Sequence, residues 1–286
     1  MVREKESLSL ILLSIGHAIH HADWNWTNVS SPFTRLYWVE DGSAKVILPS
    51  GVYTLTPNHL YMIPAFTLHS YLCDGYFSLY YVHVYEEQTE AFSYIEQLNF
   101  PFEVESTPTD VLLVKRLLEI NPNRALKLYD PSLYDNSQTL LRNISENQHL
   151  PHYLIIETKG ILLQLFSRFL KTAELKIEVT DNRLLKVLRY IRKNLNKPIS
   201  IRQLSDICFL TDDHFIKLFK KEIHCTPVQY INQKKIEKAQ VMLIIDDLPI
   251  KEIAYHLSFN NISYFNKLFK SVTGFTPGEY KRNSYV

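Results

Sequence analysis

Cysteine is scarce in this chain: among 286 residues it occurs only at Cys73, Cys208 and Cys225. These residues form no CxxC pair and have no spacing typical of zinc ligands, so the sequence argues against a zinc-bound or disulfide-framed domain. Such sparse cysteines fit a reducing compartment, and we expect a cytoplasmic protein. Glycine is scarce too, with seven residues, and the sequence contains no glycine-rich phosphate loop.

A long apolar run is also absent. Residues 8–15 are apolar, but a membrane span needs about 20 such residues. The run follows Arg3 and Lys5, as in a signal peptide, yet the same region carries Glu4 and Glu6 and no small-residue cleavage site follows. We therefore interpret it as a buried strand and expect no membrane partner.

Acidic residues are few in the last third of the chain. From Arg183 onward there are 18 Lys/Arg and 9 Asp/Glu, a net charge of +9, whereas the first 182 residues carry −8. This split suggests that only the C-terminal part meets a polyanion. A basic face can also be simply solvated, so charge alone leaves both interpretations open.

Hydrophobic periodicity divides the chain into three regions. Residues 1–88 show short apolar runs between closely spaced turns, which is typical of a β sandwich or barrel. Residues 89–180 show helical spacing, clearest over 153–173, and lead into a polar linker at 176–182. Residues 181–286 carry helical signals throughout. We predict an α+β protein with an N-terminal cupin-like β-barrel, a helical linker and dimerisation region, and a C-terminal all-α domain.

The predicted helix at 153–173 is apolar on nearly all sides. One face is expected to pack on the β domain, and a second apolar face needs another surface to cover it. We expect that surface to be a second copy of the chain, with Leu163 and Phe166 at the contact.

The C-terminal region contains an internal repeat. The matching segments are 201–205 with 250–254, 215–220 (FIKLFK) with 265–270 (FNKLFK), and 226–229 (TPVQ) with 276–279 (TPGE). The first pair is offset by 49 residues and the others by 50, so the second copy has one extra residue in its turn. The segments starting at Ser200, Thr226 and Thr276 have the form of capping boxes, which predicts a helix start at each.

Each copy is predicted to form a short helix, a turn and a second helix with a basic and amide outer face. The expected outward residues are Asp213, Ile216, Lys217, Lys220 and Lys221 in the first copy, and Ser263, Asn266, Lys267 and Lys270 in the second. A second helix of this kind, braced by the first, is typical of a helix-turn-helix that enters the DNA major groove. We expect Lys220, Lys270, Lys234 and Lys235 to neutralise phosphates. The alternative is a helical repeat that binds protein, but such arrays usually need three or more copies.

The stretch 259–270 (FNNISYFNKLFK) and the following 274–277 (GFTP) resemble the signature of the AraC/XylS transcription regulators. The resemblance extends over residues 184–282, and 235–243 (KIEKAQVML) is similar to the start of the helix that joins the two units in that family. It implies two helix-turn-helix units on successive major-groove segments, with double-stranded DNA and RNA polymerase as partners. The residues it places against bases are Asp213, Ile216, Lys217, Ser263, Asn266 and Lys267.

Three residues depart from the family pattern. The family usually has glycine near the positions of Phe209, His224 and Ser258. Because glycine is favoured where φ is positive, we expect strain in these turns.

The first region resembles the cupin-like sensor domain often found in this family, through 36–42 (LYWVEDG), 53–57 (YTLTP), 60–64 (LYMIP) and 69–71 (HSY). The resemblance implies a small-molecule effector, with a sugar as one candidate. Flat aromatic faces can stack on such a ligand. The candidate ligand-binding residues are Trp24, Tyr37, Trp38, Tyr61, His69 and Tyr81.

Metal binding is the alternative for this domain. Metal-dependent cupins have a His-x-His pair and a nearby glutamate, and no such pair follows Gly42. His17, His20, His21 and Asp23 form another candidate cluster, although such residues also gather by chance. We therefore predict no metal and no cofactor.

These observations predict a sequence-specific, DNA-binding transcription regulator, with activation as the favoured mode, that works as a homodimer and is not an enzyme. A cupin-type metalloenzyme fused to a DNA-binding module is the main alternative, which elemental analysis would distinguish. A DNA-alkylation repair protein is a further alternative. That chemistry needs an activated thiolate, and Asp74 beside Cys73 disfavours one.

Overall fold

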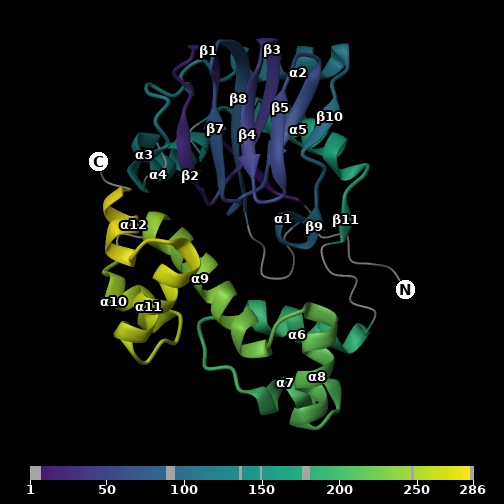
Figure 1. The fold of residues 1–286 in the computed structure, drawn as a ribbon, viewed down its shortest axis with the longest axis vertical. Coiled ribbons are helices and arrows are strands. Elements are labelled where there is room, and N and C mark those ends of the chain that lie inside the picture. The colour runs from purple at the N-terminus through teal and green to yellow at the C-terminus, as the bar shows by residue number, and fades with distance from the viewer. Residues whose placement is uncertain are drawn as a thin grey trace. The chain divides into compact units, whose positions relative to one another are not determined.

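The computed structural model describes residues 8–87, 94–134, 137–148, 150–175, 181–245 and 248–283. The chain folds into two compact units (Figure 1). One holds the β sheets with the helices between residues 98 and 174, and the other holds residues 94–97 and the helices that follow residue 181. The expected region boundaries near 88 and 180, and most of the expected linker at 176–182, lie outside the described residues.

The N-terminal unit contains two antiparallel sheets with the strand orders β1-β8-β3-β6-β10 and β2-β7-β4-β5. Their bounds are β1 Leu10–His21, β2 Trp26–Val29, β3 Thr34–Gly42, β4 Ala44–Leu48, β5 Gly51–Leu55, β6 His59–Ile63, β7 His69–Leu72, β8 Tyr76–Glu86 and β10 Glu103–Glu105. The buried strand expected at 8–15 is confirmed as the start of β1. Closure of the two sheets into a barrel stays a prediction.

The core of this unit lies between the inner faces of the two sheets. In β4, Ala44 and Val46 are buried and Lys45 and Ile47 are exposed, because successive side chains of a strand point to opposite faces. The inner faces carry many aromatic rings beside the aliphatic residues. This core therefore contains several of the side chains that the sequence proposed for ligand binding.

The same unit has helices beside its sheets. Their bounds are α2 Pro108–Glu119, α3 Pro131–Tyr134, α4 Ser137–Gln148 and α5 His152–Leu170. The short helix α1 Tyr94–Gln97 is grouped with the other unit, and the two-residue strands β9 Leu98–Asn99 and β11 Glu174–Leu175 pair with each other. The helix expected at 153–173 is confirmed as α5, which packs on β1, β10 and α2. Phe166 is 1% exposed and its ring lies 5.3 Å from that of Phe100. Its expected place on a dimer surface is therefore wrong: Phe166 belongs to the core.

The C-terminal unit consists of helices (Figure 1). Their bounds are α6 Asn182–Lys193, α7 Ile201–Cys208, α8 Asp212–Ile223, α9 Pro227–Ile245, α10 Ile250–His256, α11 Ile262–Thr273 and α12 Pro277–Asn283. The predicted capping boxes are confirmed: at each box the cap hydroxyl accepts from the third backbone N–H, and the third side chain accepts from the cap N–H. Helices α7 and α8 bury one apolar cluster and α10 and α11 another, and α9 contributes to both.

The three residues that stand where the family has glycine all adopt left-handed backbone conformations. The φ angles are 55° at Phe209, 61° at His224 and 56° at Ser258. His224 and Gly274 end α8 and α11 in the same way, each donating its N–H to the carbonyl four residues earlier, of Lys220 or Lys270. The expected strain therefore lies at these positive-φ residues. The two copies differ at the end of the second helix, where the first has a strained histidine and the second has glycine.

This difference predicts opposite effects of exchanging the two cap residues. We expect His224→Gly to raise the free energy of unfolding by about 1 kcal/mol and Gly274→His to lower it by at least as much, since an L residue is strained at positive φ. A Cβ at Gly274 meets nothing within 4 Å, so backbone conformation is the cause. Urea unfolding of the full chain, followed by circular dichroism at 222 nm, measures both changes.

The control for these variants uses the positions of the tryptophans. The three tryptophans are Trp24, Trp26 and Trp38, all in the N-terminal unit, so tryptophan fluorescence follows that unit separately. Both variants should leave the fluorescence transition in place. Equal stabilities of the two variants would contradict the assignment of strain to the cap.

Candidate functional site

Paired aromatic residues fix the inner faces of α8 and α11. Phe215 and Phe219 are fully buried with ring centroids 5.6 Å apart, and Phe265 and Phe269 repeat this at 5.8 Å. Each second ring is covered by a tyrosine from the following helix, at 5.7 Å for Tyr230 and at 5.3 Å for Tyr280. Because these faces are occupied, the opposite face of each helix is left toward solvent.

The residues proposed to read DNA lie on those outward faces. The exposed ones are Asp213, Lys217, Lys220 and Lys221 on α8, and Ser263, Asn266, Lys267 and Lys270 on α11. Ile216 differs, because it is half-buried and packs against the cluster formed by α7 and α8. Each helix thus presents a polar strip outside its own core, with three lysines among the four exposed residues on α8 and two among the four on α11.

The turns before the two helices share one backbone arrangement. The N–H of Leu210 donates to the Ser205 carbonyl at 3.0 Å, and that of Phe259 donates to the Ala254 carbonyl at 2.9 Å. Thr211 then caps α8, whereas one additional residue, Asn260, precedes the cap of α11. The extra residue inferred from the repeat therefore lies after the shared hydrogen bond and before the cap of α11.

Two of the lysines proposed to neutralise phosphate are placed differently from the rest. Lys235 is buried, with its ammonium 5.1 Å from the centre of the Phe259 ring, and burial lowers its pKa. The ammonium of Lys234 lies 2.7 Å from the Glu237 carboxylate. In this structure neither side chain lies on the exposed faces of α8 and α11. Of the four lysines expected to neutralise phosphates, Lys220 and Lys270 remain as candidates.

In the N-terminal unit, five of the six proposed ligand-binding residues are buried near the inner faces: Trp24, Tyr37, Tyr61, His69 and Tyr81. Trp38 is buried separately, against the ring of Tyr80 at 5.3 Å. The cavity lined by Trp24, Tyr37 and Tyr81 has a volume of about 20 Å³, room for one water. These side chains therefore fill the interior of the unit in the conformation described.

Hydrogen bonds connect two of these buried groups, Tyr37 and His69, through a third buried residue, Tyr71. The Tyr71 hydroxyl lies 2.6 Å from that of Tyr37 and 2.7 Å from His69 Nε2. Burial, together with the charge of Arg35, lowers the pKa of His69 to about 3. Burial also holds the pKa of Tyr37 well above its ordinary value. His69 is therefore a neutral member of a hydrogen-bonded network rather than a cation.

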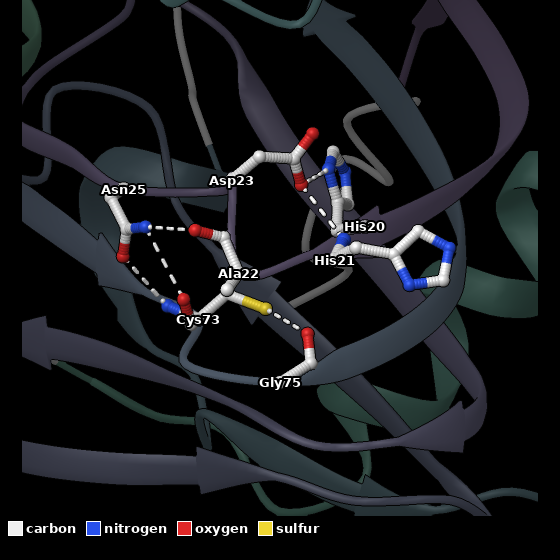
Figure 2. Close-up of polar contacts among 7 residues, drawn as sticks. All are labelled: His20, His21, Ala22, Asp23, Asn25, Cys73 and Gly75. Atoms are coloured by element: carbon white, nitrogen blue, oxygen red, sulfur yellow. Dashed lines mark hydrogen bonds and ion pairs between the residues drawn. The ribbon is translucent and has the colours of Figure 1, made fainter.

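The cluster considered as an alternative metal site does not converge on one point. His20 Nδ1 lies 3.1 Å from the Asp23 carboxylate, which also accepts the backbone N–H of His21, and the His21 ring points away (Figure 2). His17 contacts Glu40 at 2.8 Å instead. Within the described residues no group of three or more His, Cys, Asp or Glu side chains is arranged to hold a metal ion.

Cys73 is buried and held by its neighbours. Its thiol donates to the Gly75 carbonyl at 3.2 Å, and its backbone N–H donates to Asn25 Oδ1 at 2.9 Å (Figure 2). A nucleophilic thiolate needs access to its substrate. This geometry favours a structural role.

The comparisons with known proteins concern mainly the C-terminal unit. A family model described as a helix-turn-helix domain matches residues 204–283. The xylose operon regulatory protein of Escherichia coli is 32% identical over 103 residues, which is 36% of this chain and 26% of that protein. This region is a helix-turn-helix domain of the AraC/XylS family.

Two further comparisons give a second partial sequence relative and a similar fold. AdaA of Bacillus subtilis, a bifunctional transcriptional activator and DNA repair enzyme, is 35% identical over 98 residues, 34% of this chain and 46% of that protein. The chain thus spans less than half the length of these two curated relatives. Apo ToxT of Vibrio cholerae has a similar fold, with a TM-score of 0.50 at 15% identity over 94% of this chain and 97% of that chain.

The AraC/XylS-type domain presents two further side chains that sequence reasoning missed. His214 and Tyr264 stand 50 residues apart, each the third residue of its helix, and both are exposed. The repeat itself was the signal, since it aligns them next to Asp213 and Ser263. Tyr264 accepts a hydrogen bond from Asn232 Nδ2 at 2.9 Å, which links α11 to α9.

Among the helices of the described residues, none combines the length and apolar character that crossing a bilayer requires.

Proposed function

We propose that the protein is a transcription regulator that binds specific double-stranded DNA through two helix-turn-helix units and senses a small molecule through its N-terminal unit. The observation that carries the proposal is the repetition of one cationic outward face on α8 and α11, each braced by buried phenylalanines. Selection of duplexes from a random library by the full chain tests it. Enrichment of one two-part motif is the expected result, and no enrichment would exclude sequence-specific binding.

The side chains on the two outward faces suggest different contacts with DNA. On α11, Asn266 and Lys267 offer an amide that pairs with adenine and an ammonium that donates to guanine. On α8, Asp213 and Ile216 are poor partners for phosphate. Lys217 is therefore the main hydrogen-bond donor of this helix. We infer that the second unit contributes more base contacts than the first.

Lys220 and Lys270 are proposed to contact phosphates, because both are exposed near the end of the second helix in their unit. Removal of either by Lys→Ala should flatten the slope of log affinity against log salt by about 0.9 per contact, on specific and random DNA alike. Fluorescence anisotropy at several salt concentrations measures the slope. Lys45→Ala, at an exposed lysine of the N-terminal unit, is the control and should change nothing.

We also propose that α5 pairs with α5 of a second copy. Tyr153, Ile156, Leu163 and Ser167 are exposed on one face of the helix, and Gly160 is half-buried on the same face. Spacings of three, four and seven residues place all five on a single stripe. The opposite face of α5 is already buried in its own unit. An apolar stripe of this kind on a helix that packs well elsewhere supports a paired helix.

A sensing role for the N-terminal unit is supported by its many buried aromatic and polar groups around a small cavity. In the proposed mechanism, binding of the effector changes the position of the two DNA-binding domains of the dimer on DNA. Genomic footprinting of the full chain would identify the neighbouring genes, and their products would indicate the class of effector.

A further inference from the structure

A second, larger cavity lies beside β1, outside the interior of the sheets. It has a volume of about 410 Å³ and is bounded by Ser14, residues 123–128 and α4. Small-molecule sites commonly have volumes of about 300–1,000 Å³. Unlike the aromatic interior, this cavity has room for an organic molecule without any rearrangement of the core.

One wall of the cavity is formed by a buried arginine. Arg124 is 6% exposed, and its carbonyl accepts a hydrogen bond from the N–H of Ile15, which attaches it to β1. Its Nη1 donates to the Asn143 carbonyl at 2.6 Å. Among the described residues, its Nη2 has no hydrogen-bond partner. A buried charged donor without a partner is costly, so an acceptor supplied by a ligand would remove that cost.

The charges around the cavity are unbalanced. Arg124, Lys127 and Arg142 line it together with a single carboxylate, that of Glu146. Glu146 lies 3.6 Å from Arg124 Nε and 3.8 Å from Arg142 Nε, so it is shared between two guanidinium groups. Burial lowers the pKa of Arg124. The negative charge of Glu146 opposes this shift only in part. The lining therefore carries an excess of two positive charges.

Part of the remaining lining is apolar. Ala125, Leu126 and Tyr134 line the cavity, and Leu128 does so while 59% exposed. A guanidinium fork matches the oxygens of carboxylate and phosphate. We propose that this cavity binds a small organic anion, whose carboxylate or phosphate is held by Arg124, Lys127 and Arg142 and whose apolar body covers Leu126 and Leu128. Its use as the effector site rests on the proposed regulatory function.

Calorimetric titration of the full chain with matched probes tests the site. Benzoate and phenyl phosphate carry the two candidate groups on the same ring, and benzamide is the neutral counterpart. We expect saturable binding of at least one anion, about tenfold or more tighter than that of benzamide, because charge-assisted hydrogen bonds are lost in the amide. The anion that binds more tightly identifies the group that the site prefers.

Variants connect this binding to the cavity. Lys127 and Arg142 are exposed, so K127Q combined with R142Q keeps the fold even where loss of Arg124 would not. The pair should weaken anion binding about tenfold or more, and Lys45→Gln should leave it unchanged. Three results would overturn the site: no saturable binding up to about 10 mM, equal binding of benzamide, or unchanged binding in the double variant.

The DNA measurements separate this inference from the proposed function. Without probe, the double variant should bind the selected DNA as the unmodified chain does. If the unmodified chain binds the anion but no DNA, the regulatory function fails and the site stands. If it binds DNA and none of the probes, the site fails and the regulatory function stands.

Discussion

Ile156→Glu combined with Leu163→Glu is expected to convert the protein from a dimer to a monomer. The two side chains are 71% and 41% exposed on the same stripe of α5, so the substitutions place four unpaired carboxylates in the proposed helix pair without entering the core. Binding to a two-site promoter should weaken by about 100-fold or more, because the second domain no longer binds at high effective concentration. Light scattering and anisotropy measure the two effects.

Two other substitutions make the dimer prediction specific. Val52→Glu changes an exposed apolar residue of β5 and should leave the dimer intact. Phe166→Glu places a charge in the buried contact with Phe100 and should unfold the N-terminal unit instead of producing a folded monomer. A monomeric unmodified protein at about 50 µM, well above micromolar affinity, would disprove the pairing of α5.

Asn266→Ala is expected to relax sequence preference at one base pair, with a loss of about 1–3 kcal/mol of discrimination. The side chain is exposed on α11, and the adjacent Phe265 holds the opposite face, so the domain should stay folded. Lys267→Ala should act in the same way at a neighbouring position. Selection from a random library with each variant, compared with the unmodified chain, measures the preference base by base.

Lys270→Ala is the matched control for Asn266→Ala, since it lies on the same helix and is expected to contact phosphate. It should weaken binding to all sequences without changing the selected motif. The assignment of base contacts to Asn266 would be refuted by equal losses on specific and random DNA.

Local signals predicted the C-terminal helices well because those signals act over a few residues. Capping hydroxyls, prolines at the first helical position and apolar residues at helical spacing all depend on near neighbours in the chain. The 50-residue repeat then aligned the two outward faces, and each of its buried phenylalanines lies where the pattern placed it. Alternation in β4 and the apolar run that begins β1 were predictable for the same reason.

Positions whose role depends on distant segments were not predictable in this way. Phe166 and Leu163 are equally apolar in the sequence, but α5 packs on β1 and β10, which buries one and leaves the other exposed. Lys235 belongs to a basic run, but the tertiary fold places the Phe259 ring beside its ammonium. Neither outcome follows from periodicity. It predicts that a helix has an apolar and a polar face, but it does not predict which residues cover each face.

The sequence by itself therefore determined that a β region precedes the helical regions, and it determined the repeat and its outward lysines, because each arises from spacing along the chain. It also marked Phe209, His224 and Ser258 as departures, and the structure located the positive φ at all three. Only the tertiary structure decided which charges are free and which are buried. It brought Arg124, Lys127 and Arg142 around one cavity, since β1 and α4 meet there although they are far apart in the sequence.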